Sequence, residues 1–199
     1  MKTKERIIET ALHLFNEAGT SAVSTNHIAD ALGISPGNLY YHFRNKEEII
    51  RAILERLIAR RKEIYRLPAD RPPTVADLQR MVRQNFLLLW DYRFFYRELI
   101  ALMQRDALLK ERYQAVRRQG LAHFEILFER FVQAGVVRMP ADSMTVSDLA
   151  RMCWLISDYW RPFVEMDGEL TMAEYMQQGV RLVLQALHPY MSVVAQADG

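Results

Sequence analysis

The chain has 199 residues, of which half are hydrophobic and a quarter are charged. These proportions exclude a disordered chain and a coiled-coil rod, and they favour a protein with a large apolar core. The formal net charge of +2 is too small to indicate a nucleic-acid binder, although residues 1–66 hold 11 Lys and Arg against 8 Asp and Glu. One cysteine, Cys153, excludes an intramolecular disulfide, and the lack of a signal segment or membrane-length apolar run predicts a cytoplasmic protein without membrane contact.

Helical periodicity fills the N-terminal third of the chain. Apolar residues spaced three and four apart predict a first helix that ends at Gly19, and a two-turn helix that Ser24 caps and Gly33 ends. Ser35 can cap a third helix whose first residue, Pro36, has no N–H to leave unpaired. The first four expected helices are 7–18, 25–32, 36–42 and 46–65.

The stretch 67–73 holds three prolines and cannot lie inside a helix, so it predicts a boundary between two parts of the chain. Longer periodic segments follow it, and no segment alternates with the period of a strand. The prediction is an all-α fold of about nine helices. The five expected helices after the boundary are 74–92, 94–105, 106–134, 145–165 and 171–190.

Residues 25–46 have the layout of a helix-turn-helix, in which the second helix enters the DNA major groove. Leu39 and Phe43 lie one turn apart and can pin that helix to the first one. The amide of Asn38 can bridge an adenine edge, and tyrosine hydroxyls suit phosphate oxygens. Lys46 adds a positive charge at a helix N-terminus, which favours a backbone phosphate. The exposed side of the helix is expected to show Gly37, Asn38, Tyr40, Tyr41 and His42.

These residues resemble the N-terminal signature of the TetR family of transcriptional regulators, over about Ile7–Leu54. The resemblance implies a homodimer that binds a palindromic operator, usually represses, and is released when a small molecule binds its C-terminal domain. Asn26 stands where many members carry a basic residue. The motifs that carry the resemblance are Leu14-Phe15-Asn16-Glu17-Ala18-Gly19, Ile28-Ala29-Asp30-Ala31-Leu32-Gly33 and Leu39-Tyr40-Tyr41-His42-Phe43. By position it implies DNA contacts from Thr25, Asn26, Gly37, Asn38, Tyr40, Tyr41 and His42, and a phosphate contact from Lys46.

Several of these residues have a plainer interpretation. Tyr40 can serve mainly to pack the interface between helices, and His42 is as good a phosphate donor as a base reader. The run 60–62, Arg-Arg-Lys, is twice as often a solvated helix face as a nucleic-acid patch. His27 and Asp30 are too few ligands for a metal, so neither a metal nor a cofactor is expected. No phosphate-binding glycine loop, GxSxG or HExxH motif is present, which argues against an enzyme.

Aromatic side chains concentrate in the C-terminal part, where they predict either a packed core or an apolar pocket for a small hydrophobic or aromatic effector. Tyr113 and His123 would orient that effector, although His123 can equally be a hydrogen-bonded core residue. The alternative is a regulator without an effector, whose C-terminal domain engages a protein partner; activation instead of repression also stays open. The expected pocket residues are Phe86, Trp90, Phe94, Met103, Tyr113, His123, Phe124 and Phe128.

The last two helices are the best candidates for a dimer interface, because their apolar spacing continues over about three turns each. Gly179 would allow close approach of two helices. The expected domains are a helix-turn-helix domain over 1–45, a connecting helix over 46–66 and a ligand-binding and dimerisation domain over 67–199. The connecting helix is expected to be the only continuous element between pocket and DNA. The expected interface residues are Cys153, Ile156, Trp160, Met176, Gly179, Val180, Val183 and Leu187.

Overall fold

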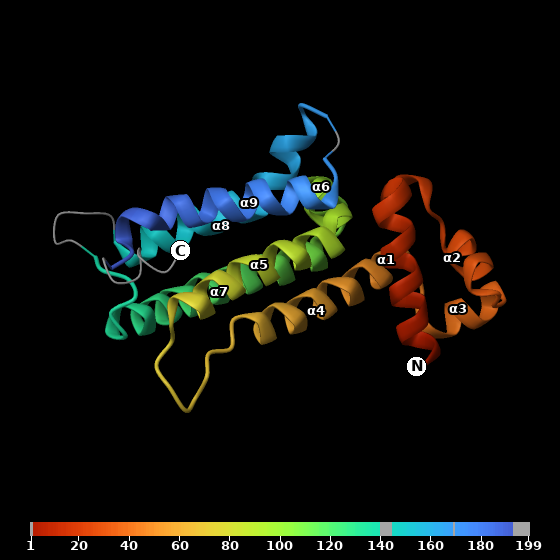
Figure 1. Ribbon diagram of the computed structural model, residues 1–199. Coiled ribbons are helices and arrows are strands. Elements are labelled where there is room, and N and C mark those ends of the chain that lie inside the picture. The colour runs from red at the N-terminus through yellow and green to blue at the C-terminus, as the bar shows by residue number, and fades with distance from the viewer. Residues whose placement is uncertain (1, 140–144, 169, 193–199) are drawn as a thin grey trace.

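The computed structural model describes residues 2–139, 145–168 and 170–192, and within these ranges the chain forms nine α-helices and a short 3-10 helix. The same ranges contain no strand, only an isolated bridge between Val137 and Met191. The predicted all-α fold is therefore confirmed (Figure 1). The helices are α1 (Thr3–Ala22), α2 (Thr25–Leu32), α3 (Pro36–His42), α4 (Lys46–Ile64), α5 (Val75–Asp91), α6 (Arg93–Arg105), α7 (Ala107–Gln133), α8 (Val146–Glu165), α9 (Met172–Leu187) and η1 (His188–Tyr190).

Local signals set the ends of the short helices at the N-terminal end of the molecule, drawn in red and orange in Figure 1. The hydroxyls of Ser24 and Ser35 each accept a hydrogen bond from the backbone N–H three residues on, and Pro36 opens α3. Gly33 ends α2 in the left-handed region, with a φ of 65°. The predicted ends of α2 and α3 are confirmed. The buried side chains of this unit include Ile7, Ala11, Phe15, Ile28, Ala29, Leu39 and Phe43.

The first helical run ends at Gly19, as predicted, and a short second run follows it within α1. Helix α1 continues to Ala22, and Gly19 interrupts it with a φ of 77° and a ψ of 162°. This break directs Thr20 towards Glu98 of α6, whose carboxylate accepts hydrogen bonds from the Thr20 hydroxyl and, at 3.1 Å, from its backbone N–H. A Cβ atom at position 19 would lie 3.0 Å from the same carboxylate. The glycine therefore ends the first helical run and also permits a contact with α6.

Helix α4 leads from the N-terminal unit along the side of a bundle made by α5 to α9 (Figure 1). It packs on α1 at one end and on α5 further along. Within the bundle α5 packs on α9, α7 packs on α8, and α8 packs on α9, so that each of these helices buries an apolar face. No helix in the described ranges is long and apolar enough to cross a lipid bilayer.

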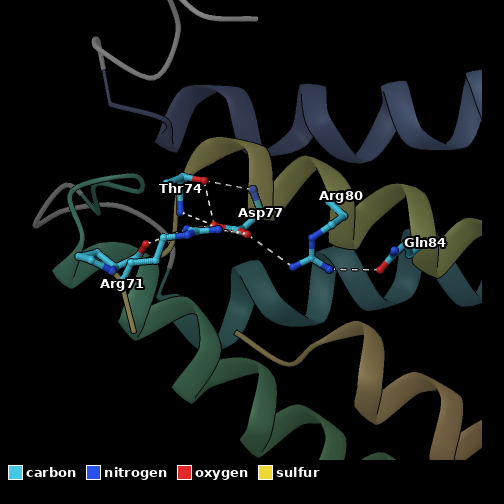
Figure 2. Close-up of polar contacts among 6 residues, drawn as sticks. Arg71, Thr74, Asp77, Arg80 and Gln84 are labelled. Carbon is cyan, nitrogen blue, oxygen red and sulfur yellow. Dashed lines mark hydrogen bonds and ion pairs between the residues drawn. The ribbon is translucent and has the colours of Figure 1, made fainter. Parts of the chain in front are cut away.

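Asp77 fastens the proline-rich connection between α4 and α5 to the first turn of α5 (Figure 2). Its carboxylate is buried and accepts hydrogen bonds from the Thr74 backbone N–H at 2.9 Å and hydroxyl at 2.8 Å. Arg71 donates two more hydrogen bonds, at 2.6 and 3.0 Å, and the Arg80 guanidinium lies 3.6 Å away. The Arg71 guanidinium holds the pKa of Asp77 well below its ordinary value of 3.8, and the Thr74 hydrogen bonds lower that pKa further.

We predict that Asp77→Asn lowers the free energy of unfolding at pH 7 by about 1–2 kcal/mol, because it weakens both the helix cap and the arginine pair. Since the pKa of Asp77 is lower in the folded chain, its contribution is present above about pH 4 and is lost as the pH falls further. Urea unfolding should therefore show a smaller difference between the variant and the wild type at pH 3 than at pH 7.

The matched control is Asp148→Asn, which removes the corresponding carboxylate from the exposed cap of α8. That variant should lose less stability at pH 7, because Asp148 is solvated and its nearest arginine, Arg151, is 3.8 Å away. An Asp77→Asn deficit that is equal at pH 3 and pH 7 would contradict the role given to the arginine pair.

Candidate nucleic-acid interface and ligand cavity

The outer side of α3 carries polar and aromatic side chains, whereas its inner side packs apolar residues into the protein. Leu39 and Phe43 are buried, whereas the Tyr41 side chain is 85% exposed. The Tyr40 and Thr25 hydroxyls lie 3.0 Å apart, so the start of α2 and the exposed side of α3 belong to one surface. The plainer interpretation, that Tyr40 packs the interface between α1 and α3, gains no support from this contact, since Thr25 lies on α2 and Tyr40 is 48% exposed. The other exposed members of this surface are Asn26, Gly37 and Asn38, and His42 is half-buried.

Lys46 joins the start of α4 to the end of α1. Its ammonium donates hydrogen bonds to the backbone carbonyls of Thr20 and Val23. These carbonyls lie at the C-terminal end of α1, where a helix favours a cation. Two of the three N–H groups of Lys46 are therefore directed into the protein, and one is left for a phosphate. The sequence indicated only the phosphate contact.

A second junction ties α1 to the start of α6. The buried Asn16 side chain donates to the Asp91 carbonyl at 2.8 Å and accepts from the Phe94 N–H at 3.1 Å. Arg93 pairs with Glu17 at 2.6 Å. The connecting helix α4 is the continuous element that was expected, and these contacts add a second, non-covalent link between the bundle and the N-terminal unit. An amide in the apolar stripe of α1, four residues after Leu12, is the sequence signal for this junction.

The centre of the bundle contains a buried ion pair surrounded by aromatic side chains. The Asp158 carboxylate of α8 lies 3.3 Å from the Arg61 guanidinium of α4 and accepts hydrogen bonds from Trp154 Nε1 at 2.6 Å and the Tyr113 hydroxyl at 3.2 Å. Arg61 also donates to the Tyr96 hydroxyl of α6 at 2.8 Å. Helices α4, α7 and α8 thus meet at one carboxylate, and α6 joins them through Arg61.

Arg61 is not part of a solvated face, as the sequence suggested, because it turns inward while Arg60 pairs with Asp91 at the surface. Burial by itself lowers the pKa of the Arg61 guanidinium, but Tyr96 and Asp158 raise it above its ordinary value. The guanidinium therefore stays charged. The sequence signal is its spacing, since Arg61 continues a stripe that includes Leu57, four residues earlier.

Two small cavities adjoin this ion pair. One is about 10 Å³ and includes Arg61, Trp154 and Asp158 in its wall. The other is about 30 Å³, and its wall is mainly apolar, with Leu78 and Phe128 among its residues. Each volume is close to that of a single water molecule. The side chains common to both walls are Tyr65, Asn85, Phe124 and Ser157.

The expected pocket residues are only partly brought together here. Phe124 and Phe128 line the larger cavity. His123 does not, because it is exposed and its ring lies 3.0 Å from the Gln119 carbonyl of its own helix. The cavity residues that the sequence prediction missed are Arg61, Tyr65, Asn85, Ser157 and Asp158. The expected residues placed outside both cavity walls are Phe86, Trp90, Phe94, Met103 and Tyr113.

These displaced residues have packing roles. The Phe86 and Phe94 rings are fully buried, and Phe94 packs on Phe15 of α1 with ring centroids 5.2 Å apart. The Trp90 ring lies against the Arg161 guanidinium, 4.7 Å from its centroid. The spacing that predicted a pocket here therefore belongs to the core, which is the commoner use of aromatic residues at a helical period.

The predicted dimer residues divide between the core and the surface. Cys153, Gly179, Val183 and Leu187 are buried within their own chain, so they cannot contact a second one, and that part of the prediction is corrected. A Cβ atom on Gly179 would lie 2.3 Å from the Phe86 ring, which means that this glycine admits an intrachain neighbour. Burial also raises the pKa of Cys153 to about 12. The remaining predicted residues, Ile156, Trp160, Met176 and Val180, are half-buried.

Two other surfaces stand out on α8 and α9. An open groove of about 710 Å³ runs between α5 and α9 and includes Met176, Val180 and Leu184 in its lining. Large apolar side chains are also exposed along the outer sides of α8 and α9. We define the outer apolar face as four of these residues: Leu155, Tyr159, Phe163 and Leu182. Among the described residues, no group of three or more His, Cys, Asp or Glu side chains could hold a metal ion.

Two sequence profiles of known families match the chain. The profile described as bacterial regulatory proteins of the tetR family matches residues 7–53, and the profile described as a bacterial transcriptional repressor, TetR, matches residues 44–198. The tetracycline repressor protein class D of Escherichia coli is 38% identical over 66 residues, which cover 33% of this chain. The matched segment spans 30% of that repressor's length.

Solved structures match over nearly the whole chain. A TetR-family transcriptional regulator from Marinobacter aquaeolei VT8 is 36% identical with a TM-score of 0.85, covering 97% of this chain and 93% of that one. The structure of SmeT in complex with triclosan is 24% identical with a TM-score of 0.68, covering 96% of this chain and 92% of that one. The second match supports the fold alone.

Proposed function

Because the chain belongs to the TetR family of bacterial transcriptional regulators, we propose that it is a homodimeric repressor that binds a palindromic operator in the cytoplasm. We further propose that a small hydrophobic effector in the C-terminal domain releases it. A chain of this family is a DNA-binding transcription regulator and not an enzyme. The observation that carries the proposal is the exposed side of α3, which Leu39 and Phe43 hold outward from the rest of the unit.

In this proposal α3 enters the major groove with its N-terminal end leading. Asn38 reads a base edge, while Thr25, Tyr40 and Tyr41 donate to phosphate oxygens and fix the register. Gly37 lets the backbone approach closely, and Asn26, His42 and Lys46 complete the contact. Because two copies would bind one site, the modest charge of each chain is sufficient for recognition.

The outer apolar face is the proposed dimer interface. Leu155 is 59% exposed and Phe163 is 56% exposed, and a row of such side chains on a single chain favours a protein contact. Two copies of α8 and α9 would form an isologous four-helix interface. Of the residues that the sequence indicated, Trp160 lies against this face, since its ring stacks on that of Phe163 with centroids 5.9 Å apart. The interface would hold the two α3 helices roughly 34–36 Å apart, as successive major grooves require.

Effector binding is proposed to act through both junctions of the N-terminal unit. Arg61 of α4 and Tyr96 of α6 meet at the central ion pair, so a ligand among them displaces both helices. Helix α4 is hydrogen-bonded to α1 through the Lys46 ammonium, and α6 is hydrogen-bonded to α1 through the Glu98 carboxylate. The ligand then favours a separation of the two α3 helices that does not fit the operator. SmeT with triclosan offers a precedent for a small ligand on this fold.

A second candidate is a regulator without an effector, whose C-terminal domain engages a protein partner. The groove between α5 and α9 favours it, because that groove is wide, mainly apolar and open to solvent. Charge-reversing Arg83→Glu, in the lining of this groove, would weaken capture of such a partner. Release of DNA by small molecules alone would argue against this candidate.

We predict that Tyr41→Ala weakens binding to operator DNA about 10- to 100-fold, because each half of the dimer loses a contact at the centre of α3. The thermal unfolding temperature should not change, since the Tyr41 side chain is almost fully exposed. Fluorescence anisotropy can measure the affinity on DNA that the wild-type protein selects from a random-sequence pool. The control is Leu108→Ala, an exposed apolar residue of α7. Wild-type affinity of the Tyr41 variant would show that α3 is oriented differently.

We predict that Leu155→Glu raises the dimer dissociation constant about 100-fold, because the dimer would bury two uncompensated carboxylates. Sedimentation velocity across a concentration series measures this constant directly. Leu108→Glu is the control, since Leu108 is 62% exposed but lies on α7. If the Leu155 variant dimerised like the wild type, the interface would have to lie elsewhere.

A further inference from the structure

The wall of the smaller central cavity leaves one hydrogen-bond donor and one acceptor unused. Among the described residues, Arg61 Nε and Asn85 Oδ1 are buried without a hydrogen-bond partner. Asn85 is only 4% exposed, and its side chain forms part of both cavity walls. A buried polar atom without a partner is costly, and natural structures seldom retain one without a reason.

The positive and negative side chains that line the smaller cavity already balance each other. The Arg61 guanidinium and the Asp158 carboxylate lie 3.3 Å apart, and Asp158 receives two further hydrogen bonds from Trp154 and Tyr113. A ligand carboxylate would add a second negative charge beside Asp158, and a ligand ammonium would add a second positive charge beside Arg61. Either charge would be buried without a counterion, so an uncharged group fits best.

The chemistry of the two unused atoms narrows the choice further. Arg61 Nε–H can only donate, and the Oδ1 atom of Asn85 can only accept. A hydroxyl has one donor and at least one acceptor site, so a single hydroxyl can satisfy both atoms at once. Ser157, in the same wall, is a further polar neighbour.

The other end of the site suits an apolar ring. Beyond Asn85 the wall of the larger cavity is formed by Leu78, Phe124, Phe128 and other apolar side chains. The two cavities together are too small for an organic ligand, so Phe124 and Tyr65, which are only half-buried, would have to move. Their rings are in edge contact at a centroid distance of 4.9 Å, and a ligand between them would separate α4 from α7.

We propose that the central site takes an uncharged hydroxyl compound with an apolar ring body, whose hydroxyl accepts from Arg61 Nε–H and donates to Asn85 Oδ1. This inference rests on the proposed function, because it names the chemical class of the effector. The ring body lies between Leu78 and Phe128, and it separates Tyr65 from Phe124. Binding therefore acts on α4, the helix that begins at Lys46.

Three probes on one ring frame test this proposal with the full chain: 2-naphthol, 2-methoxynaphthalene and 2-naphthoate. Isothermal titration at pH 7 should give an affinity for 2-naphthol at least about tenfold higher than for either of the others. The methyl ether lacks the donor that Asn85 requires, and the carboxylate brings an unbalanced charge.

Asn85→Leu identifies the site, because leucine branches at Cγ as asparagine does and has no polar atom. The variant should bind 2-naphthol at least about tenfold more weakly than the wild type does, and it should bind 2-methoxynaphthalene no more weakly. Its thermal unfolding temperature is measured alongside, and the affinities are compared at a temperature where both proteins are folded. Gln84→Leu, at the exposed neighbouring position on α5, is the matched control and should leave all three affinities unchanged.

Three results would overturn the proposal: equal binding of 2-naphthol and its methyl ether, tighter binding of 2-naphthoate, or no binding of any probe. Release of selected operator DNA is measured separately by anisotropy. Binding of 2-naphthol that depends on Asn85, without DNA release, would support the site and contradict the proposed effector function. A chain that selects no DNA at all would contradict the repressor proposal and leave the binding result to decide on the site.

Discussion

The arrangement of the bundle depends on the ion pair and the hydrogen bonds that the Asp158 carboxylate makes. It is buried, and it brings together Arg61 of α4, Tyr113 of α7 and Trp154 of its own helix. A buried charge is tolerated only with partners, so these helices must keep the relative positions that supply them. Gly120 of α7 leaves room for the Trp154 ring, since a Cβ atom there would lie 2.4 Å from that ring. The indole can reach Asp158 because α7 has no side chain at that point.

The same ion pair is joined to the DNA-binding end by two rigid helices. Along α4, Arg61 and Lys46 are 15 residues apart, a rise of roughly 22 Å. On α6, the Tyr96 hydroxyl accepts a hydrogen bond from Arg61. Two residues later, the Glu98 carboxylate accepts a hydrogen bond from the Thr20 hydroxyl. A displacement at the centre of the bundle therefore reaches α1 along two paths, and both end within the last turn of α1, around Thr20. Gly19 allows this convergence, because its backbone break directs Thr20 towards Glu98.

The N-terminal unit could be predicted in detail because its signals are local. Ser24, Gly33 and the pair Ser35-Pro36 determine helix ends through contacts within three residues, whatever the rest of the chain does. Gly19 was predicted to end a helix, but its close approach to a carboxylate on α6, 79 residues later in the chain, was not predicted. Local sequence carries no information about such a partner.

Predicting the cavity and the outer apolar face needed information that a helical period lacks. Periodicity groups Cys153 and Ile156, but it does not say which side of α8 faces inward, and the exposed row proved to be that of Leu155 and Tyr159. Arg61 and Asp158 were overlooked because charged residues are expected at the surface. Their spacing within apolar stripes was the available signal, and only the facing helix supplies the partner that makes burial tolerable.

The central claim is that the contact of Arg61 with Asp158 fixes the position of α4 and so determines how well the chain binds its operator. The most direct test is the operator affinity of Asp158→Asn, which keeps the shape of the side chain and removes its charge. At a temperature where both proteins are folded, and with no ligand present, we expect the variant to bind selected operator DNA about tenfold more weakly. A variant that is less stable than the wild type but binds the operator with the same affinity would contradict the claim.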